Sequence, residues 1–136
     1  LNNVPSPNGL VLSADEKIVY LCVTRDNAIW RVPIMHDGTA SKVGVGIQMS
    51  GGAGPDGMAV DSAGNLAVCH VLFGAVWLFS AIGEPMLRIN SPEGLLVTNC
   101  AYGGKDNKQL FITESKSGTI LVADMPVAGR PLYSHA

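Results

Sequence analysis

Short apolar runs separated by polar turns follow one another along the whole chain. Runs such as Ile18–Val23 and Ala75–Phe79 are rich in β-branched and aromatic residues, which favour strands over helices. Sixteen Gly and eight Pro are spread along the sequence, so long helices are not expected. The pattern predicts antiparallel strands at 7–13, 18–23, 28–34, 55–61, 66–70, 75–79, 98–102, 110–113 and 119–124, and weaker ones at 42–47, 86–89 and 132–133.

These strands fall into an internal repeat. The equivalent positions Asn8, Asp56 and Asn99 are 48 and 43 residues apart, and Trp30 and Trp77 follow the first two by 22 and 21 residues. Four short strands in a repeat of this size are typical of a β-propeller blade. A β-sandwich would also show a turn about every ten residues. We predict an all-β chain of three four-stranded antiparallel blades, at about 5–50, 51–94 and 95–136.

Three blades form only part of a ring. Propellers close with four to eight blades around a central channel, so three leave apolar blade faces open at both ends. The chain is therefore expected to form a single half-propeller domain, completed by a second copy of itself or by a missing N-terminal half. A start at Leu1 rather than Met favours a piece of a longer protein.

Composition narrows the expected partners and the expected location. Nine Lys and Arg against eleven Asp and Glu give a net charge of −2, which argues against nucleic acid as a partner. The share of hydrophobic residues, 47%, excludes a disordered chain, and the 15% of charged residues leaves apolar surface for a partner. The odd set Cys22, Cys69 and Cys100 predicts buried free thiols in a reducing compartment. The apolar stretch Leu66–Ile82 is interpreted as two strands and a turn, so no membrane contact and a cytoplasmic location are expected.

Three motifs occur in order at matching spacing. They are Pro-Asn-Gly-Leu followed by Ser-Ala-Asp-Glu-Lys, then Gly-Pro-Asp-Gly-Met-Ala-Val-Asp, and then Thr-Asn-Cys-Ala-Tyr-Gly-Gly. Together they resemble the C-terminal half of the senescence-marker-protein (regucalcin)/gluconolactonase family, close to its drug-responsive lactonase branch. The similarity covers nearly the whole chain, down to Pro131-Leu132-Tyr133-Ser134.

The resemblance implies a six-bladed propeller that hydrolyses lactones with a divalent cation at the mouth of its channel. It implies that Asn8 and Asp56 are metal ligands and that Asn99 lines the channel, whereas a further Glu ligand lies in the half that this chain lacks. Oxygen ligands suit Ca²⁺ and also accept Zn²⁺, Mg²⁺ or Mn²⁺. The cation would polarise the lactone carbonyl, and Asp56 is the candidate catalytic group that takes a proton from water.

Each candidate also has a plainer interpretation. Asn-Gly and Asp-Gly are strong turn formers, so Asn8 and Asp56 are open to a turn role, and Asn99 to a hydrogen bond with the neighbouring blade. His70 matches a position near the channel mouth, but a single His on a strand is often a satisfied structural residue.

Three further features are assigned from the pattern of the repeat. The Asp61 side chain is expected to stabilise the turn in which it lies, and the two Trp residues are expected to pack between blades. Three consecutive large apolar residues stand where the family has a small Gly-rich turn. They form a predicted partner contact, which consists of Val71, Leu72 and Phe73.

Two functions of different classes remain open. The first is a metal-dependent lactonase-type hydrolase whose site is completed by a second half, with a homodimer as the symmetric way to six blades. The alternative is a non-catalytic propeller-type module that binds small molecules or proteins and assembles as a dimer.

Overall fold

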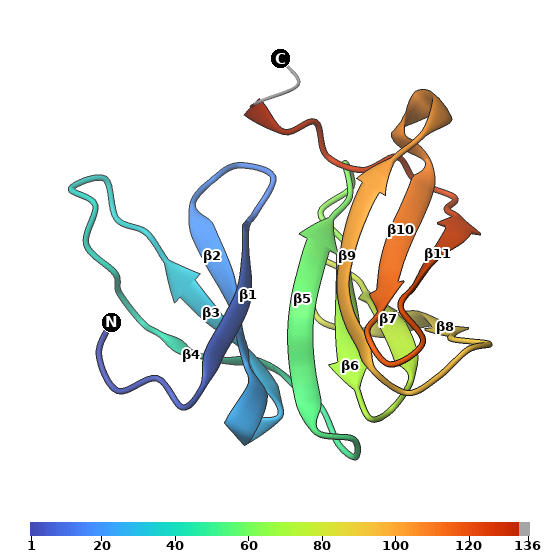
Figure 1. Cartoon of the computed structure of the whole chain (residues 1–136). Helices are drawn as coiled ribbons and strands as arrows, with labels where there is room; N and C mark the ends of the chain where they lie inside the picture. The colour runs from blue at the N-terminus through green and yellow to red at the C-terminus, as the bar shows by residue number, and fades with distance from the viewer. Residues whose placement is uncertain (134–136) are drawn as a thin grey trace.

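Three antiparallel β-sheets make up the computed structural model, which describes residues 1–133 (Figure 1). Sheet 1 contains β1 (Pro7–Leu12), β2 (Ile18–Val23), β3 (Ala28–Pro33) and β4 (Gly44–Gln48), and sheet 2 contains β5 (Gly54–Val60), β6 (Leu66–Val71), β7 (Ala75–Phe79) and β8 (Pro85–Asn90). Sheet 3 contains β9 (Val97–Gly103), β10 (Gln109–Glu114) and β11 (Thr119–Asp124). Two short 3₁₀ turns, η1 (Thr24–Asp26) and η2 (Lys105–Asn107), follow β2 and β9.

The all-β prediction and the three-sheet repeat are confirmed, with one correction. Within residues 1–133, sheet 3 has three strands, so the predicted three four-stranded blades become two of four and one of three. The fourth strand predicted at Leu132–Tyr133 does not form, because this segment leaves sheet 3 and Tyr133 is 97% exposed. The third predicted repeat ran to residue 136, and residues 134–136 lie outside the described part.

The stretch Leu66–Ile82 forms β6, a turn and β7, as predicted. In the described residues no helix is long and apolar enough to cross a membrane.

The first strand of each sheet lies beside the first strand of the next sheet. β1 lies next to β5, and β5 lies next to β9 (Figure 1). Within each sheet the following strands step outward in chain order, because each strand pairs antiparallel with the next one along the chain. The starts of β1, β5 and β9, which are distant in sequence, are therefore brought to one edge of the molecule.

Two hydrophobic cores fill the spaces between the sheets. The first core lies between sheets 1 and 2 and contains Cys22, Ile29 and Val68. The second lies between sheets 2 and 3 and contains Cys69 and Cys100. Because side chains alternate along a strand, sheet 2 supplies both cores. The predicted buried free thiols are confirmed for all three cysteines.

Within residues 1–133 the outer faces of sheets 1 and 3 are apolar, and no other sheet packs on them. Trp77 packs against the first core, as predicted. Trp30 does not pack between the sheets, because it shares a cross-strand row with Leu10 on the face of sheet 1 that points away from sheet 2. Leu10 is 63% exposed there, and Ile120 is 68% exposed on the corresponding outer face of sheet 3.

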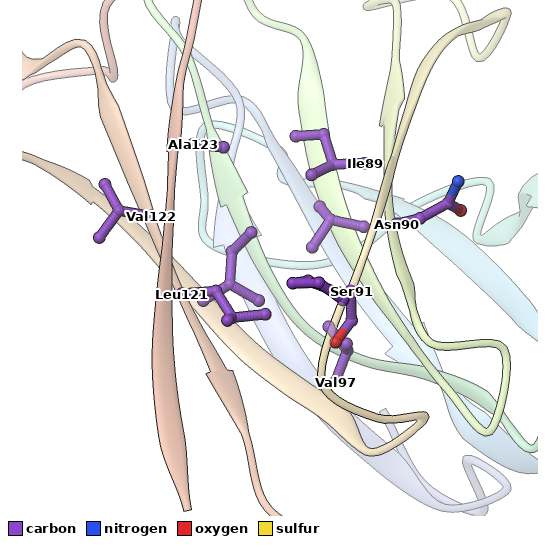
Figure 2. A pocket seen from close by; sticks show the side chains of 10 residues that line it. Ile89, Asn90, Ser91, Val97, Leu121, Val122 and Ala123 are labelled. Carbon is purple, nitrogen blue, oxygen red and sulfur yellow. The ribbon is translucent and has the colours of Figure 1, made fainter. Parts of the chain in front are cut away.

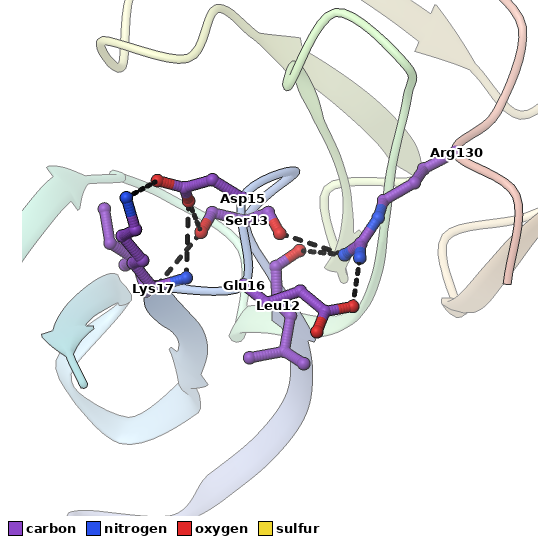
Figure 3. Close-up of polar contacts among 7 residues, drawn as sticks. Leu12, Ser13, Asp15, Glu16, Lys17 and Arg130 are labelled. Carbon is purple, nitrogen blue, oxygen red and sulfur yellow. Dashed lines mark hydrogen bonds and ion pairs between the residues drawn. The ribbon is translucent and has the colours of Figure 1, made fainter. Parts of the chain in front are cut away.

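The segment after β11 crosses the far ends of the first strands. Its Gly129 carbonyl accepts a hydrogen bond of 2.7 Å from the Asn107 side chain, and the Arg130 amide donates to the Val60 carbonyl. Figure 3 shows the Arg130 side chain reaching sheet 1, where it donates to the Ser13 carbonyl at 2.9 Å and pairs with Glu16. This segment joins sheet 3 to sheets 2 and 1.

Candidate functional site

The Pro-Asn-Gly and Pro-Asp-Gly motifs form matching bulges in two neighbouring strands. The pairing of β1 with β2 shifts between Pro7 and Leu10, and the pairing of β5 with β6 shifts between Pro55 and Met58. Asn8 and Asp56 therefore lie inside strands rather than in turns, and the turn interpretation is wrong for both. A β-bulge redirects a side chain away from the regular alternation. The same kind of bulge thus presents one polar side chain at the start of each of these two strands.

The glycines of these motifs are required by the close approach of the strands. A Cβ atom at Gly9 would overlap with the Asp56 carbonyl, and a Cβ atom at Gly57 would overlap with the Asn99 side chain. The same Cβ atom at Gly57 would lie 2.8 Å from the Cα atom of Asn99. Only a residue without a side chain allows this spacing. The glycines therefore bring β1, β5 and β9 into backbone contact at the positions of the candidate residues.

Asn8 and Asp56 form a polar pair across β1 and β5. Asp56 is half-buried, and partial burial raises the pKa of its carboxyl, whereas the nearby Asn8 side chain lowers it. The Asn8 amide nitrogen also donates to Thr24 Oγ1 at 3.2 Å. Because the nitrogen makes this bond, the Asn8 carbonyl oxygen remains able to accept a donor or to bind a cation.

Thr24 is a member of this site that the sequence did not reveal. Its hydroxyl accepts from Asn8 and donates to the Pro55 carbonyl at 2.7 Å. It thereby fixes the orientation of Asn8 and ties sheet 1 to the residue before Asp56. The only signal in the sequence was its place at the end of the apolar run Ile18–Val23.

Asn99 lies beside this pair but is already engaged. Its side chain contacts Gly57, the neighbour of Asp56. Its Oδ1 accepts a hydrogen bond of 2.9 Å from the Cys100 amide, and its own backbone amide donates to Thr113 Oγ1. The oxygen retains one lone pair. The structure thus brings Asn8, Asp56 and Asn99 together at one edge.

The three oxygens fit a hard divalent cation as a partial ligand set. One carboxylate and two amide carbonyls are the oxygen ligands that such ions prefer. Within residues 1–133 no group of three His, Cys, Asp or Glu side chains is gathered, so a cation here would depend on amide oxygens as well as on Asp56. A half-buried carboxylate whose polar partner is a neutral amide favours the approach of a positive charge.

His70 lies beside the Pro-Asp-Gly bulge, because it pairs with Pro55 across β5 and β6, and its place in the channel lining stays a prediction. Its ring is 1% exposed and stacks on Phe73 with ring centroids 4.9 Å apart. Its Nε2 lies 2.9 Å from the Gly51 carbonyl. Since a carbonyl only accepts, Nε2 carries the proton, and burial lowers the pKa of the ring. In the described chain His70 is closed off from solvent, as a structural histidine would be.

The segment Val71–Phe73 is covered mainly by its own chain. Phe73 packs between His70 and Trp77, and the Arg88 guanidinium lies 5.8 Å from its ring centroid. Leu72 alone is prominently exposed, at 54%, in a turn with a positive φ of 60°. A partner contact at Val71, Leu72 and Phe73 stays a prediction, and Leu72 is the side chain that offers surface for it.

Comparison with known proteins places the chain among lactone-hydrolysing relatives. Residues 1–116 match the SMP-30/gluconolactonase/LRE-like region. A 6-deoxy-6-sulfogluconolactonase of Pseudomonas putida is 32% identical over 126 residues, 90% of this chain and 43% of that enzyme. A lactonase drp35 of Staphylococcus saprophyticus is 34% identical over 95 residues, 68% of this chain and 29% of that protein.

Solved structures agree with these sequence relatives. A calcium-binding protein, regucalcin, of Agrobacterium tumefaciens superposes with a TM-score of 0.80 and 28% identity, over 93% of this chain and 49% of that one. A gluconolactonase of Xanthomonas campestris superposes with a TM-score of 0.71 and 28% identity, over 83% of this chain and 36% of that one. This chain spans less than half the length of each of these four relatives.

Proposed function

The chain belongs to the SMP-30/gluconolactonase/LRE-like family, and from this premise we propose that it is part of a cation-dependent lactonase. The proposal is supported most by the Asn8–Asp56 pair, which stands in matching bulges of neighbouring strands beside Asn99. In this proposal Asp56 and Asn8 hold a divalent cation, Ca²⁺ before Zn²⁺, Mg²⁺ or Mn²⁺, and Asn99 lines the channel.

Each residue has a distinct task in lactone hydrolysis. When bound, the cation supplies Lewis-acid polarisation of the lactone carbonyl and lowers the pKa of a bound water. Asp56 accepts a proton from the attacking water, because its carboxylate stands in the bulge beside Asn8. Thr24 fixes Asn8 by a hydrogen bond, and Asn8 lies beside the carboxylate.

Room for a small molecule lies next to this group. A cavity of about 420 Å³ runs along β1, β5 and β9, beginning at Leu10, Met58 and Cys100. Its walls are mostly apolar, and the lining residues that carry polar groups are Glu16, Tyr102, Asn107, Arg130 and Tyr133. Cavities of several hundred Å³ with few polar groups are typical of small-molecule sites, so this volume suits a lactone.

We further propose that the propeller has six blades and that a partner completes it. The face of sheet 2 that packs on sheet 1 carries Trp77, and the equivalent face of sheet 1 carries Trp30 and points outward. A surface of this kind, apolar and matched to an internal interface, favours coverage by another blade. A second copy of the chain or a missing N-terminal half supplies the three blades, together with further ligands for the cation.

A cation titration tests the site in the chain as it stands. Calorimetry with Ca²⁺, Zn²⁺, Mg²⁺ and Mn²⁺ is expected to give heat with the parent chain and none with Asp56→Asn. The matched control is Asp106→Asn, which removes an exposed acid in η2, far along the chain from these bulges. Equal heats in Asp56→Asn and the parent would contradict the cation role of Asp56.

Light scattering and a lactone assay separate the two functions. A strictly monomeric chain in dilute solution would exclude the homodimer and leave the missing half as partner. Hydrolysis of gluconolactone by the completed ring, lost in Asp56→Asn, supports the enzyme. Cation binding by the completed ring without hydrolysis of any lactone supports the alternative, a non-catalytic binding module.

A further inference from the structure

A cavity lined by aromatic rings lies between the outer strands of sheets 1 and 2. It measures about 310 Å³, and its walls come from the end of β4 on one side and from β6, β7 and the start of β8 on the other. The rings in its wall belong to His70, Phe73, Trp77 and Phe79. Small-molecule sites typically measure about 300 Å³ or more, so this cavity has room for a small aromatic ligand.

The cavity on the other face of sheet 2 is smaller and differs in chemistry. Figure 2 shows Ile89 of β8 and Leu121 of β11 on opposite sides of it. It measures about 130 Å³, and the described residues that line it include no aromatic ring and no charged side chain. Of the two, the ring-lined cavity therefore offers the size and the chemistry for a specific ligand.

Arg88 places a positive charge beside the ring-lined cavity. It stands opposite Trp77 in the pairing of β7 with β8, so both side chains lie on the same face of sheet 2. Its guanidinium carbon lies 5.5 Å from the centroid of the Trp77 ring and 5.8 Å from that of the Phe73 ring. Arg88 is exposed, and within residues 1–133 no carboxylate pairs with it. Its charge is therefore available to an anionic group of a ligand.

Two buried nitrogens of wall residues lack a hydrogen-bond partner. His70 donates from Nε2 to the Gly51 carbonyl, so its Nδ1 is an acceptor, and no donor of the described chain bonds to it. Trp77 Nε1 is a donor, and it has no acceptor among the described residues. Unsatisfied polar atoms are rare in protein interiors because they cost free energy. A hydroxyl group of a ligand, which both donates and accepts, matches these atoms.

The polar groups are specific to this cavity rather than common to the repeat. Sheet 1 also has a Trp at the position equivalent to Trp77, and its Nε1 likewise lacks a partner. The positions equivalent to His70 and Arg88, however, hold Val23 and Val45. The repeat therefore requires neither an imidazole nor a guanidinium beside its Trp, which favours a binding role for both groups.

We propose that this cavity binds a small aromatic carboxylate that carries a hydroxyl group. The carboxylate pairs with Arg88, and the aromatic ring packs against Phe73 and Trp77. The hydroxyl donates to His70 Nδ1. All four residues lie within residues 70–88, so the site is separate from the proposed cation site and requires neither the completed ring nor a cation.

Nuclear magnetic resonance of the indole N–H groups tests binding directly. The chain has two Trp residues, so a ¹⁵N-labelled sample gives two indole signals, and Trp30→Phe assigns them. The probe is 4-hydroxybenzoate, added in EDTA so that no divalent cation takes part. A saturable shift of the Trp77 signal is expected, with the Trp30 signal unchanged. The absence of a saturable shift at Trp77, or equal shifts of both signals, would overturn the proposal.

Three analogues of the probe test the three contacts. 4-Hydroxybenzamide lacks the negative charge, cyclohexanecarboxylate lacks the aromatic ring, and benzoate lacks the hydroxyl. Each is expected to bind at least about threefold more weakly than 4-hydroxybenzoate, because each loses one contact. Equal affinities for 4-hydroxybenzoate and 4-hydroxybenzamide would overturn the pairing with Arg88, and equal affinities for 4-hydroxybenzoate and benzoate would overturn the bond to His70.

Substitutions place the ligand in this cavity. Arg88→Gln is expected to weaken binding of 4-hydroxybenzoate at least about fivefold, whereas Arg31→Gln, the matched change at an exposed arginine of β3, is expected to leave it unchanged. His70→Phe keeps an aromatic ring and is expected to bind 4-hydroxybenzoate no better than benzoate. Unchanged affinity in Arg88→Gln would overturn the proposal even if His70→Phe does not fold. These readouts involve no cation, lactone or second chain, so failure here leaves the proposed function standing.

Discussion

Two glycines set the geometry of the candidate site more than its polar side chains do. Gly9 and Gly57 place β1, β5 and β9 in backbone contact, and Asn8, Asp56 and Asn99 follow from that contact. The polar residues contribute orientation through Asn8, Thr24 and the Pro55 carbonyl. At the scale of single residues, we therefore expect a methyl group added at Gly9 or Gly57 to be the small change that disturbs the site most.

Gly57→Ala is expected to lower the free energy of unfolding by about 1–3 kcal/mol, because the new methyl group overlaps with Asn99 and forces β5 and β9 apart. Urea denaturation measures this change in the free energy of unfolding. Gly44→Ala is the matched control, since no atom lies within 4 Å of its Cβ position, and it is expected to stay within about 0.5 kcal/mol of the parent. Similar losses in both variants would contradict the close-contact argument.

Glu114 gives the molecule a predictable response to acid. Hydrogen bonds from the Ser117 hydroxyl and amide, and from the Leu96 amide, lower the pKa of its carboxyl below the usual 4.5. A lowered folded-state pKa means that the stabilisation is complete above pH 4.5 and is lost as the pH falls through the folded value. The parent is therefore expected to melt above Glu114→Gln at pH 7, and the difference is expected to shrink toward pH 3.

Thermal melting between pH 3 and 7 checks this trend. Glu84→Gln, an exposed change in the turn before β8, is expected to show no such convergence. A difference in melting temperature between the parent and Glu114→Gln that is the same at pH 3 and pH 7 would contradict the predicted pH dependence.

At the scale of elements, the segment after β11 acts as a brace. It bonds to η2, to the end of β5 and, through Arg130, to the turn after β1 (Figure 3). Sheets 1 and 3 are not neighbours, so this brace joins elements that the two cores leave separate. Loss of this segment is therefore expected to destabilise β1, β5 and β9 together.

Arg130→Ala is expected to cost about 1–3 kcal/mol of unfolding free energy, because the Leu12 and Ser13 carbonyls lose a charged donor. Glu16→Ala removes only the exposed partner of the ion pair and is expected to cost less than about 1 kcal/mol. Urea denaturation of both variants separates the two contacts. Equal costs would show that the ion pair, rather than the carbonyl contacts, holds the brace.

The strands themselves could be predicted from the sequence, because apolar runs between Gly, Asn and Asp turns fix where each strand begins and ends. Ile18–Val23, Ala75–Phe79 and Thr119–Asp124 were predicted with their observed bounds. The turn at Asp61 was also predicted, and its carboxylate accepts from the Ala63 and Asn65 amides. These features depend on neighbours in sequence.

What could not be predicted depends on contacts distant in sequence. The bulges at Asn8 and Asp56 look like turns until the neighbouring strand is in place. Leu132–Tyr133 reads as a strand by composition, yet the bonds of Gly129 and Arg130 carry the segment away from sheet 3. Phe73 looked exposed because its cover, Arg88 and Trp77, comes from later strands.

At the scale of the whole molecule, sheet 2 is covered on both faces, and sheets 1 and 3 are each covered on one. Sheet 2 is therefore shared by both cores, which couples them. The outward faces with Trp30 and Ile120 are where the molecule is expected to associate. A chain with 15% charged residues has little charge to keep such faces apart.

The chemical reactivity of the three cysteine thiols measures the coupling between the two cores. Burial raises the pKa of the Cys22 thiol, and Cys69 and Cys100 lie in the second core, so all three are expected to resist an aromatic disulfide reagent under native conditions. In urea they are expected to react at one common rate, because losing either core exposes sheet 2. Mass spectrometry of labelled peptides measures each site. Faster labelling of Cys22 than of Cys100 would show that sheet 1 opens by itself.

The backbone contact at Gly9 and Gly57 also limits how such a protein can diversify. Since main-chain atoms set the spacing of the first strands, a side chain added at Gly9 or Gly57 would widen it, whereas substitutions at neighbouring positions would leave it unchanged. New ligand preferences would then have to arise in the connecting loops, while Asn8, Asp56 and Asn99 keep a constant spacing.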